Sequence, residues 1–294
     1  MRKNIVIYSN CAGNVLKTMF LNHELTHDKF NIDHIVNYNN LDKENLSISH
    51  ISLLKNCDIF IYQPMNNNYD FSQYNINYVK KNLKKECMII RVNYYRFKGF
   101  WYECNYIPYH KYSGYSFHNI HGIYKEIKNL SNKTCKNSVV NFINNIQINE
   151  NELNNFFDTE LKKLKLLDDC SDVNMYDFFE LNYKDKILFH DQFHPTNIFF
   201  YEIFRQLIEK ICCYKLPKDD NEFLSKDVIN NIEMTHWVTP ILPIVRDILK
   251  LNYKDTIECF HLECHPKKIF MNIYDYYYIR LSPENFENYL KSVL

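Results

Sequence analysis

Glycine is scarce in this sequence, with four residues in 294. The glycine-rich signatures of nucleotide binding are absent, because the chain contains neither a GxGxxG fingerprint nor a P-loop. The GxSxG turn that carries the nucleophile of conventional serine hydrolases is absent as well. Nucleotide-cofactor enzymes and conventional serine hydrolases therefore have no motif here to support them.

Net charge is also lacking, since 35 Lys and Arg residues balance 35 Asp and Glu residues. A balanced chain has no overall field that would hold nucleic acid or an anionic membrane surface. We therefore expect no nucleic-acid partner. Any anionic ligand must be held by a local group of basic residues.

Paired cysteines and long apolar runs are missing too. The ten cysteines are scattered without a CxxC pair, which favours reduced thiols in the cytosol over a disulfide framework. The N-terminal apolar run, IVIY, is too short for a signal peptide, and HWVTPILPIV is interrupted by Pro240 and Pro243. The sequence predicts a cytoplasmic protein without a transmembrane segment.

Hydrophobic residues make up 46% of the chain and aromatic residues 16%, which is typical of a globular protein with a substantial core. Strand-like runs at residues 4–8, 30–38, 57–64 and 87–95 alternate with helical patterns at 13–25, 47–57 and 74–85. This alternation predicts an α/β fold, a flavodoxin-like doubly wound and mainly parallel sheet with added helices. The strand at 4–8, apolar from Ile5 to Tyr8, is expected at its centre.

The rest of the chain predicts a less regular organisation. We expect irregular structure over residues 99–135, two helices within 138–170 with the second starting near Asn151, a short strand at 185–190 and a helix after Pro195. The run YDYYYIRL, at residues 274–281, is interpreted as an edge strand or packed β-element. The predicted domains are a catalytic domain at 1–215, with a helical insertion near 137–170, and a packed extension of helical or mixed structure at 216–294.

Cys11 directly follows the first predicted strand and precedes a helix. A nucleophile at a helix N-terminus gains stabilisation of its anion from the helix dipole. The backbone amides of Ala12 or Gly13 and the side chains of Asn10 and Asn14 are candidate oxyanion donors. The alternative is that Cys11 is a small packed hydrophobic residue.

A candidate base lies in the segment HDQFHP. Asp191 and His194 are three residues apart, a spacing that lets the carboxylate orient the imidazole. His190 is a competing base that the sequence does not separate from His194. The alternative is that this segment is only a turn before a capped helix.

Two of these segments carry a resemblance to known families. IVIYSNCAGNVL and LFHDQFHPTN resemble the first and last blocks of the SGNH (GDSL-like) hydrolase fold, with Cys11 at the position of the serine. The chain resembles more closely the WcbI-type capsular polysaccharide biosynthesis family, through its N-C motif, the segment CDIFIYQPM and a late HPT segment. RVNYYRFKGFWYECNYIPY matches a further family feature in part, because the histidine-proline pair usual after the glycine is replaced by FWYEC. The resemblance covers roughly residues 4–110 and 185–212.

That resemblance implies acyl transfer, chiefly of acetyl, from coenzyme A thioester to a sugar of a surface polysaccharide. It implies that Cys11 attacks the thioester or assists transfer, that His194 acts as base and that Asp191 orients it. Gln63 would donate to the oxyanion. The acceptor would be a sugar or glycan, and an oligomer is possible.

Coenzyme A carries several phosphate charges, which require local cations in a neutral chain. The fourth predicted strand and the residues after it offer the basic residues Arg91, Arg96 and Lys98, interleaved with the aromatic residues Tyr94, Tyr95 and Phe97. These aromatic rings are candidates for stacking on adenine. The alternative is an amphipathic strand whose cations are solvated.

Two other interpretations of the site remain open. A thiol-dependent esterase on the same fold would use water in place of the sugar, and a non-catalytic carbohydrate-binding or assembly protein would keep only the pocket. A metal site is not expected, since the segment CFHLECHP, at residues 259–266, lacks a second ligand pair at zinc-finger spacing.

Overall fold

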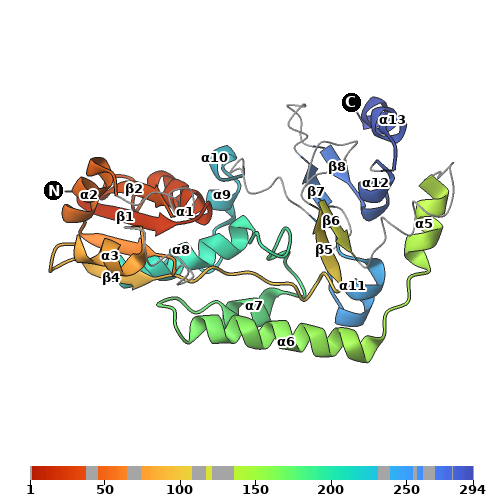
Figure 1. The fold of residues 1–294 in the computed structure, drawn as a ribbon, viewed down its shortest axis with the longest axis horizontal. Helices are drawn as coiled ribbons and strands as arrows, with labels where there is room; N and C mark the ends of the chain where they lie inside the picture. Colours follow the sequence, from red (N-terminus) through yellow and green to blue (C-terminus); the bar gives the residue numbers. More distant parts are fainter. Residues whose placement is uncertain are drawn as a thin grey trace. The chain divides into compact units, whose positions relative to one another are not determined.

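A computed structural model describes residues 2–37, 46–64, 74–107, 117–120, 136–230, 239–253, 257–260, 269–279 and 281–293. They form two compact units, each built from three segments of the chain. Unit 1 comprises residues 1–95, 165–178 and 197–232, and unit 2 comprises residues 96–164, 179–196 and 233–294. Figure 1 shows the helices and strands of the chain, labelled and coloured along the sequence. The expected division after residue 215 stays a prediction.

Unit 1 contains a four-stranded parallel sheet in the order β2-β1-β3-β4. Its strands are β1 (Lys3–Ser9), β2 (Phe30–Val36), β3 (Ile59–Tyr62) and β4 (Met88–Arg91). This order confirms the predicted doubly wound α/β fold of flavodoxin-like type. β1 lies between β2 and β3, as predicted from its apolar sequence.

The helices of unit 1 follow the predicted pattern. They are α1 (Ala12–Asn22), α2 (Ile48–Lys55), α3 (Ile76–Lys81), α8 (Asn197–Cys212), α9 (Asn221–Leu224) and α10 (Asp227–Asn230). α1 buries Val15, Leu16, Met19 and Phe20. The ring of Phe20 meets that of Phe204 of α8 edge to face, at 5.0 Å between ring centroids. This aromatic contact packs α1 against α8.

Both faces of the sheet are covered. Val6, Tyr8 and Phe60 belong to a buried cluster with Leu54 of α2 and Val79 of α3. The alternate residues of β1 and β3 point to the other face and are buried as well. β1 is therefore enclosed on both faces and hydrogen-bonded along both edges.

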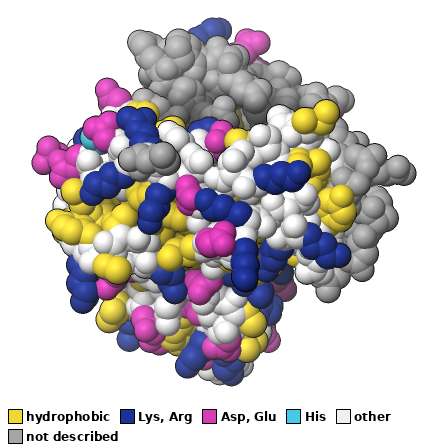
Figure 2. All heavy atoms as spheres, turned by 90° about the vertical axis from the view of Figure 1, so that its left-hand side faces the viewer, with side chains coloured by type: hydrophobic (Ala, Val, Ile, Leu, Met, Phe, Trp, Pro, Cys, Tyr) yellow, Lys and Arg dark blue, Asp and Glu magenta, His cyan; other side chains and the backbone are white. Residues whose placement is uncertain are grey.

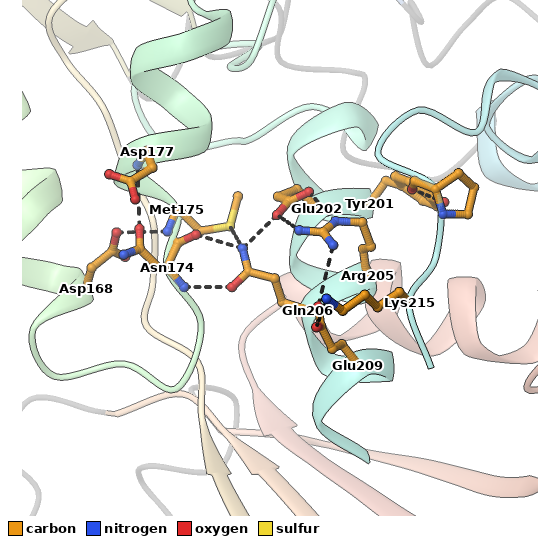
Figure 3. Close-up of polar contacts among 11 residues, drawn as sticks. Asp168, Asn174, Met175, Asp177, Tyr201, Glu202, Arg205, Gln206, Glu209 and Lys215 are labelled. Atoms are coloured by element: carbon orange, nitrogen blue, oxygen red, sulfur yellow. Dashed lines mark hydrogen bonds and ion pairs between the residues drawn. The ribbon is translucent and has the colours of Figure 1, made fainter. Parts of the chain in front are cut away.

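A polar network joins α8 to Asn174 and Met175, just before helix α7 (Tyr176–Asn182), as Figure 3 shows. Glu202, 5% exposed, accepts two hydrogen bonds from Arg205 at 2.7 and 2.8 Å and one from Gln206 at 2.8 Å. Gln206 also accepts from the backbone amide of Asn174 and donates to its carbonyl, at 2.8 and 2.7 Å. The buried carboxylate is thus paired with a cation and accepts three hydrogen bonds, which offset the cost of burying its charge.

Unit 2 is assembled around two antiparallel strand pairs and several helices. The strands are β5 (Cys104–Ile107) with β6 (Phe117–Ile120), and β7 (Ile257–Phe260) with β8 (Ile269–Met271). The helices are α5 (Lys136–Asn144), α6 (Glu150–Asp168), α7 (Tyr176–Asn182), α11 (Pro243–Leu249), α12 (Ile273–Tyr278) and α13 (Pro283–Val293). The last residues of α6 and the first residues of α7 belong to unit 1.

An aromatic cluster forms the core of unit 2. Phe97 has no exposed surface and contacts Phe100, Phe157, Phe179 and Phe189 at 4.4–6.0 Å between ring centroids. Phe179 also stacks on Tyr183, which extends the cluster along α7. The predicted role of Phe97 in stacking on a ligand is therefore wrong, because its ring is enclosed by protein.

Three local predictions are wrong or incomplete. Residues 185–190 form no ladder with the sheet and make only an isolated bridge, Phe189 to Pro195, because the chain folds back on itself there. The run 274–281 is not a strand, since residues 273–278 form α12, whose start is capped by Asn272 accepting from the amide of Asp275 at 2.9 Å. Residues 99–135 include the β5–β6 pair, and 108–116 and 121–135 lie outside the described residues.

Charged side chains of both signs are dispersed among hydrophobic ones on the face of the molecule in Figure 2. This mixture agrees with the zero net charge of the chain. Within the described residues, no helix has the length and hydropathy that crossing a membrane requires.

We expect Phe97→Ala to lower the free energy of unfolding by about 3–5 kcal/mol, as removal of a fully buried ring does. The neighbouring Arg96 is exposed, so Arg96→Ala should stay within about 0.5 kcal/mol of the wild type. Denaturant unfolding of both variants measures the difference. A loss below about 1 kcal/mol for Phe97→Ala would contradict the core assignment.

Candidate functional site

Cys11 lies at the junction between β1 and α1. Its backbone is already helical, with φ −52° and ψ −26°, and the helix begins at Ala12. The first turn of α1 carries no acidic side chain, so its positive end faces Cys11 without a competing carboxylate. The cysteine is half-buried. The predicted strand–cysteine–helix arrangement is confirmed.

Asn10 organises the turn before the helix. Its side-chain Oδ1 accepts from the amide of Ala12 at 3.0 Å, and its carbonyl accepts from the amide of Gly13 at 3.0 Å. Its own amide donates to Oε1 of Gln63 at 3.0 Å. An oxyanion would therefore have to compete for the Ala12 and Gly13 amides, whereas Gln63, 6% exposed, keeps its amide nitrogen as a donor.

His34 is part of the same region, although its sequence context predicted no role for it. It lies on β2, in register with Ile7 of β1. Its Nδ1 is 2.8 Å from Oδ1 of Asn14, and its Nε2 is 3.2 Å from Oγ of Ser9. No local motif marks this histidine, because only the pairing of parallel strands brings it to the turn.

Asp191 and His194 form the predicted pair within unit 2. The carboxylate, 1% exposed, lies 2.8 and 2.9 Å from Nδ1 of His194 through its two oxygens. It also accepts from the amides of Phe193 and His194 at 2.7 and 2.8 Å. Because Nδ1 is held by the carboxylate, Nε2 of His194 is the nitrogen that faces other groups.

The loop that carries this pair is a short fold-back. The amide of His190 donates to the carbonyl of His194 at 2.8 Å, and the amide of Thr196 donates to that of Leu188 at 2.9 Å. The amide of Phe97 donates to the carbonyl of Gln192 at 3.1 Å, which ties the loop to the aromatic cluster. The loop conformation is therefore fixed by backbone bonds rather than by a long strand.

His190 and His194 differ in their surroundings. Burial lowers the pKa of His190 to about 4, an effect that the nearby Asp191 carboxylate only partly opposes. A histidine with that pKa is a weak base at neutral pH. His194 has a carboxylate on Nδ1, the arrangement that supports an imidazole base.

The predicted cofactor residues have separate environments. Arg91 of β4 donates from Nε to Asn93 at 3.1 Å, and Tyr94 is half-buried. Arg96 is exposed, and Nζ of Lys98 lies 5.9 Å from the ring centroid of Phe193, beside His194.

Tyr95 is not available for stacking. It is 2% exposed, and its hydroxyl donates to Asp168 at 2.8 Å. The stacking role predicted for Tyr95, like that for Phe97, is wrong.

The predicted site residues fall into two groups. Unit 1 holds one group, made up of Asn10, Cys11, Gly13, Gln63, Arg91 and Tyr94, and unit 2 holds the other, made up of Arg96, Lys98, Asp191 and His194. The structure establishes the geometry within each unit. The joint action of Cys11 with His194 stays a prediction.

Metal ligands do not cluster in the described part of the chain, where no group of three His, Cys, Asp or Glu side chains is placed to hold an ion. Residues 261–266 of the segment CFHLECHP lie outside the described residues, so the prediction for that segment stays untested.

Comparison with known proteins gives two matches. A family model described as polysaccharide biosynthesis enzyme WcbI matches residues 4–214. A solved structure of WcbI, described as a novel polysaccharide biosynthesis enzyme in a native form without a disulfide bond between coenzyme A and one of its cysteines, superposes with a TM-score of 0.67. The match has 18% identity and covers 98% of this chain and 91% of that chain. No curated protein matches.

We expect Gly13→Ala to destabilise the protein by about 1–3 kcal/mol through overpacking. A Cβ at this position would lie closer than 3.0 Å to Oγ of Ser9 and to Nε2 of His34. Ala12→Ser, a substitution in the same turn, is the matched control and should change stability by less than about 0.5 kcal/mol. Equal unfolding midpoints for Gly13→Ala and the wild type would show that the turn does not have this close packing.

Proposed function

The chain belongs to the WcbI family of polysaccharide biosynthesis enzymes, and from that premise we propose that it transfers an acyl group, chiefly acetyl, from a coenzyme A thioester to a sugar hydroxyl. The acceptor is a sugar of a surface polysaccharide or glycan. The description of the similar solved structure, which names coenzyme A together with a cysteine, supports a thioester as the donor.

The observation that carries this proposal is the Asp191–His194 pair. A buried carboxylate fixed by two backbone amides holds Nδ1 of the imidazole. It stabilises the imidazolium that forms when Nε2 accepts a proton. A sugar hydroxyl is a weak nucleophile until a base removes its proton. His194 is the base that this acceptor needs.

Cys11 supplies the second part of the proposed chemistry. Its thiolate, stabilised by the N-terminus of α1, attacks the thioester carbonyl carbon, and the bond from that carbon to the sulfur of coenzyme A breaks. His194 passes the proton taken from Cys11 to the departing thiolate. It then takes the proton of the sugar hydroxyl, whose oxygen attacks the acyl carbon carried by Cys11. The bond from that carbon to the sulfur of Cys11 breaks, and His194 returns the proton to the thiolate of Cys11. The balance is one ester formed and one thioester consumed.

Charge develops on the carbonyl oxygen in both steps, and Gln63 is the proposed donor to it. Its Oε1 is used by the amide of Asn10 at 3.0 Å, which fixes the orientation of the side-chain amide. The amide nitrogen is then a preorganised donor, and such donors act on developing charge without reorganisation. The buried position of Gln63 strengthens this effect.

Arg96 and Lys98 are the proposed contacts for the phosphates of coenzyme A. Arg96 is exposed, and Lys98 lies beside Phe193 in the loop that precedes His194. Cations at these positions offer charge-assisted hydrogen bonds to phosphate oxygens. They also supply the local positive charge that a chain of zero net charge otherwise lacks. Arg91 and Tyr94 are the proposed contacts in unit 1.

We expect His194→Ala to lower the rate of acetyl transfer from acetyl-coenzyme A to a sugar acceptor by on the order of 10²–10⁴-fold, the usual contribution of a general base. Cys11→Ser and Asp191→Asn should also lower kcat. The measurement is release of free coenzyme A thiol across a panel of sugars, with and without acceptor. His27→Gln, a change at a half-exposed histidine whose Nε2 contacts Asp28, is the matched control.

The same assay separates the competing functions. Thiol release that needs no sugar would identify an esterase, and the absence of any release with full sugar binding would identify a carbohydrate-binding protein. Full activity of His194→Ala together with loss of activity in His190→Gln would overturn the assignment of the base.

We expect coenzyme A to raise the melting temperature of the wild type, because a ligand that binds the native state stabilises it by mass action. The shift should shrink in the double variant Arg96→Ala, Lys98→Ala and persist in Lys186→Ala, Lys215→Ala, which removes two other surface lysines. Thermal-shift titration in low and high salt measures it. An equal shift in both double variants would show that other residues hold the phosphates.

A further inference from the structure

His34 occupies a position in unit 1 that the proposed chemistry does not use. It lies near the carboxyl end of β2, where neighbouring parallel strands bring their last residues together. Ser9 ends β1, and the backbone amide of Asn37, just after β2, donates to the carbonyl of Ser9 at 2.9 Å. A hydrogen bond therefore joins the ends of the two strands next to residues 10–14, the turn that carries Cys11 and that we call the cysteine turn.

The imidazole contacts the chain on both sides of Cys11. Nε2 is 3.2 Å from Oγ of Ser9, two residues before the cysteine, and Nδ1 is 2.8 Å from Oδ1 of Asn14, three residues after it. One rigid ring thus connects the end of β1 to the first turn of α1. The cysteine lies on the short span of chain between the two contacts.

Glycine at position 13 makes this arrangement possible. A Cβ there would lie closer than 3.0 Å to Nε2 and Cδ2 of His34. The ring is therefore packed against the backbone of the helical turn itself. This packing is a third contact of the ring with the turn, in addition to its contacts with Ser9 and Asn14.

The ring is suited to holding the turn rather than to moving a proton. Burial lowers the pKa of His34, and Lys17 of α1 acts in the same direction against the backbone carbonyls of Ser9 and Asn10. A neutral ring can donate from Nδ1 to Oδ1 of Asn14, while Nε2 lies 3.2 Å from the hydroxyl of Ser9, whose proton is shared with the carbonyl of Asn10 at 3.1 Å. Both ring nitrogens are then used within the protein.

We propose that His34 is a positioning residue that fixes Cys11 by holding the chain on both sides of it, an inference that rests on the proposed role of Cys11 as nucleophile. The ring does not touch the reacting atoms in this proposal. It sets the direction of the thiol relative to the N-terminus of α1. A displacement of about 1 Å from the reactive geometry can cost on the order of 100-fold in rate.

The test replaces the ring with two side chains of different polarity. His34→Leu keeps much of the volume but makes no hydrogen bond, whereas His34→Gln retains one donor and one acceptor. Asn14→Ala removes one end of the contact at an exposed position and tests the proposal even where His34→Leu fails to fold. His27→Gln is the matched histidine control.

Two readouts are measured on each variant. The first is the rate of alkylation of Cys11 by iodoacetamide relative to the exposed Cys213, followed by peptide mass spectrometry. The second is kcat and KM for acetyl transfer from acetyl-coenzyme A. We expect His34→Leu to lower the alkylation ratio about 3-fold or more and kcat on the order of 10- to 100-fold with little change in KM. His34→Gln should recover part of both losses, and Asn14→Ala should lower both in the same direction.

The proposal is overturned if folded His34→Leu and Asn14→Ala both keep the wild-type alkylation ratio and kcat. It is also overturned if His34→Gln loses as much as His34→Leu, because hydrogen bonding would then have no part in the effect. Failure of the proposed function is recognised separately. In that case Cys11→Ser retains full transfer or no transfer is found at all, while the alkylation ratio still reports on the positioning of Cys11.

Discussion

The burial of β1 is the constraint on which the cysteine turn depends. The strand is paired along both edges and its side chains are buried on both faces of the sheet. An enclosed strand of this kind has no freedom to slide or twist, since a shift of one residue would move every side chain to the wrong face. The position of Asn10, the residue that follows the strand, is therefore fixed as well. Asn10 then converts that position into a turn by satisfying the first amides of α1.

The loop around Asp191 and His194 is fixed in another way. It has no long strand on either side, only a single bridge, and its conformation depends on the buried carboxylate of Asp191. The same carboxylate accepts two backbone amides and holds the imidazole. Loss of this group would therefore affect the shape of the loop and the orientation of the ring together. Asp191→Asn is a better probe than Asp191→Ala for this reason, because an amide keeps one acceptor oxygen for the backbone.

The sequence predicted the local patterns and missed the contacts that depend on tertiary pairing. The apolar run IVIY and the DxxH spacing are each contained in a few consecutive residues, so the central strand and the histidine–carboxylate pair were predictable. His34 was not, since its relation to Ser9 exists only after two parallel strands align. The run DKILFH at 185–190 suggested a strand, but Leu188 and Phe189 are buried without a sheet ladder. The run YDYYYIRL suggested a strand because of its aromatic residues, although Asn272 just before it caps the start of a helix.

The hydrogen bonds of the cysteine turn also limit where catalytic charge stabilisation can come from. The amides of Ala12 and Gly13 point toward Asn10, and the amide of Asn14 donates to the carbonyl of Cys11 at 3.0 Å. These bonds hold the helix start in place, so they are not spare donors for a substrate oxygen. The positive end of α1 still acts on Cys11, because a helix dipole arises from the aligned peptide groups and not from one unpaired amide. In the proposed reaction the turn therefore stabilises the thiolate through the dipole, whereas the oxyanion needs a separate donor. Gln63 meets that requirement because one end of its amide is already engaged by the turn and the other end is a donor.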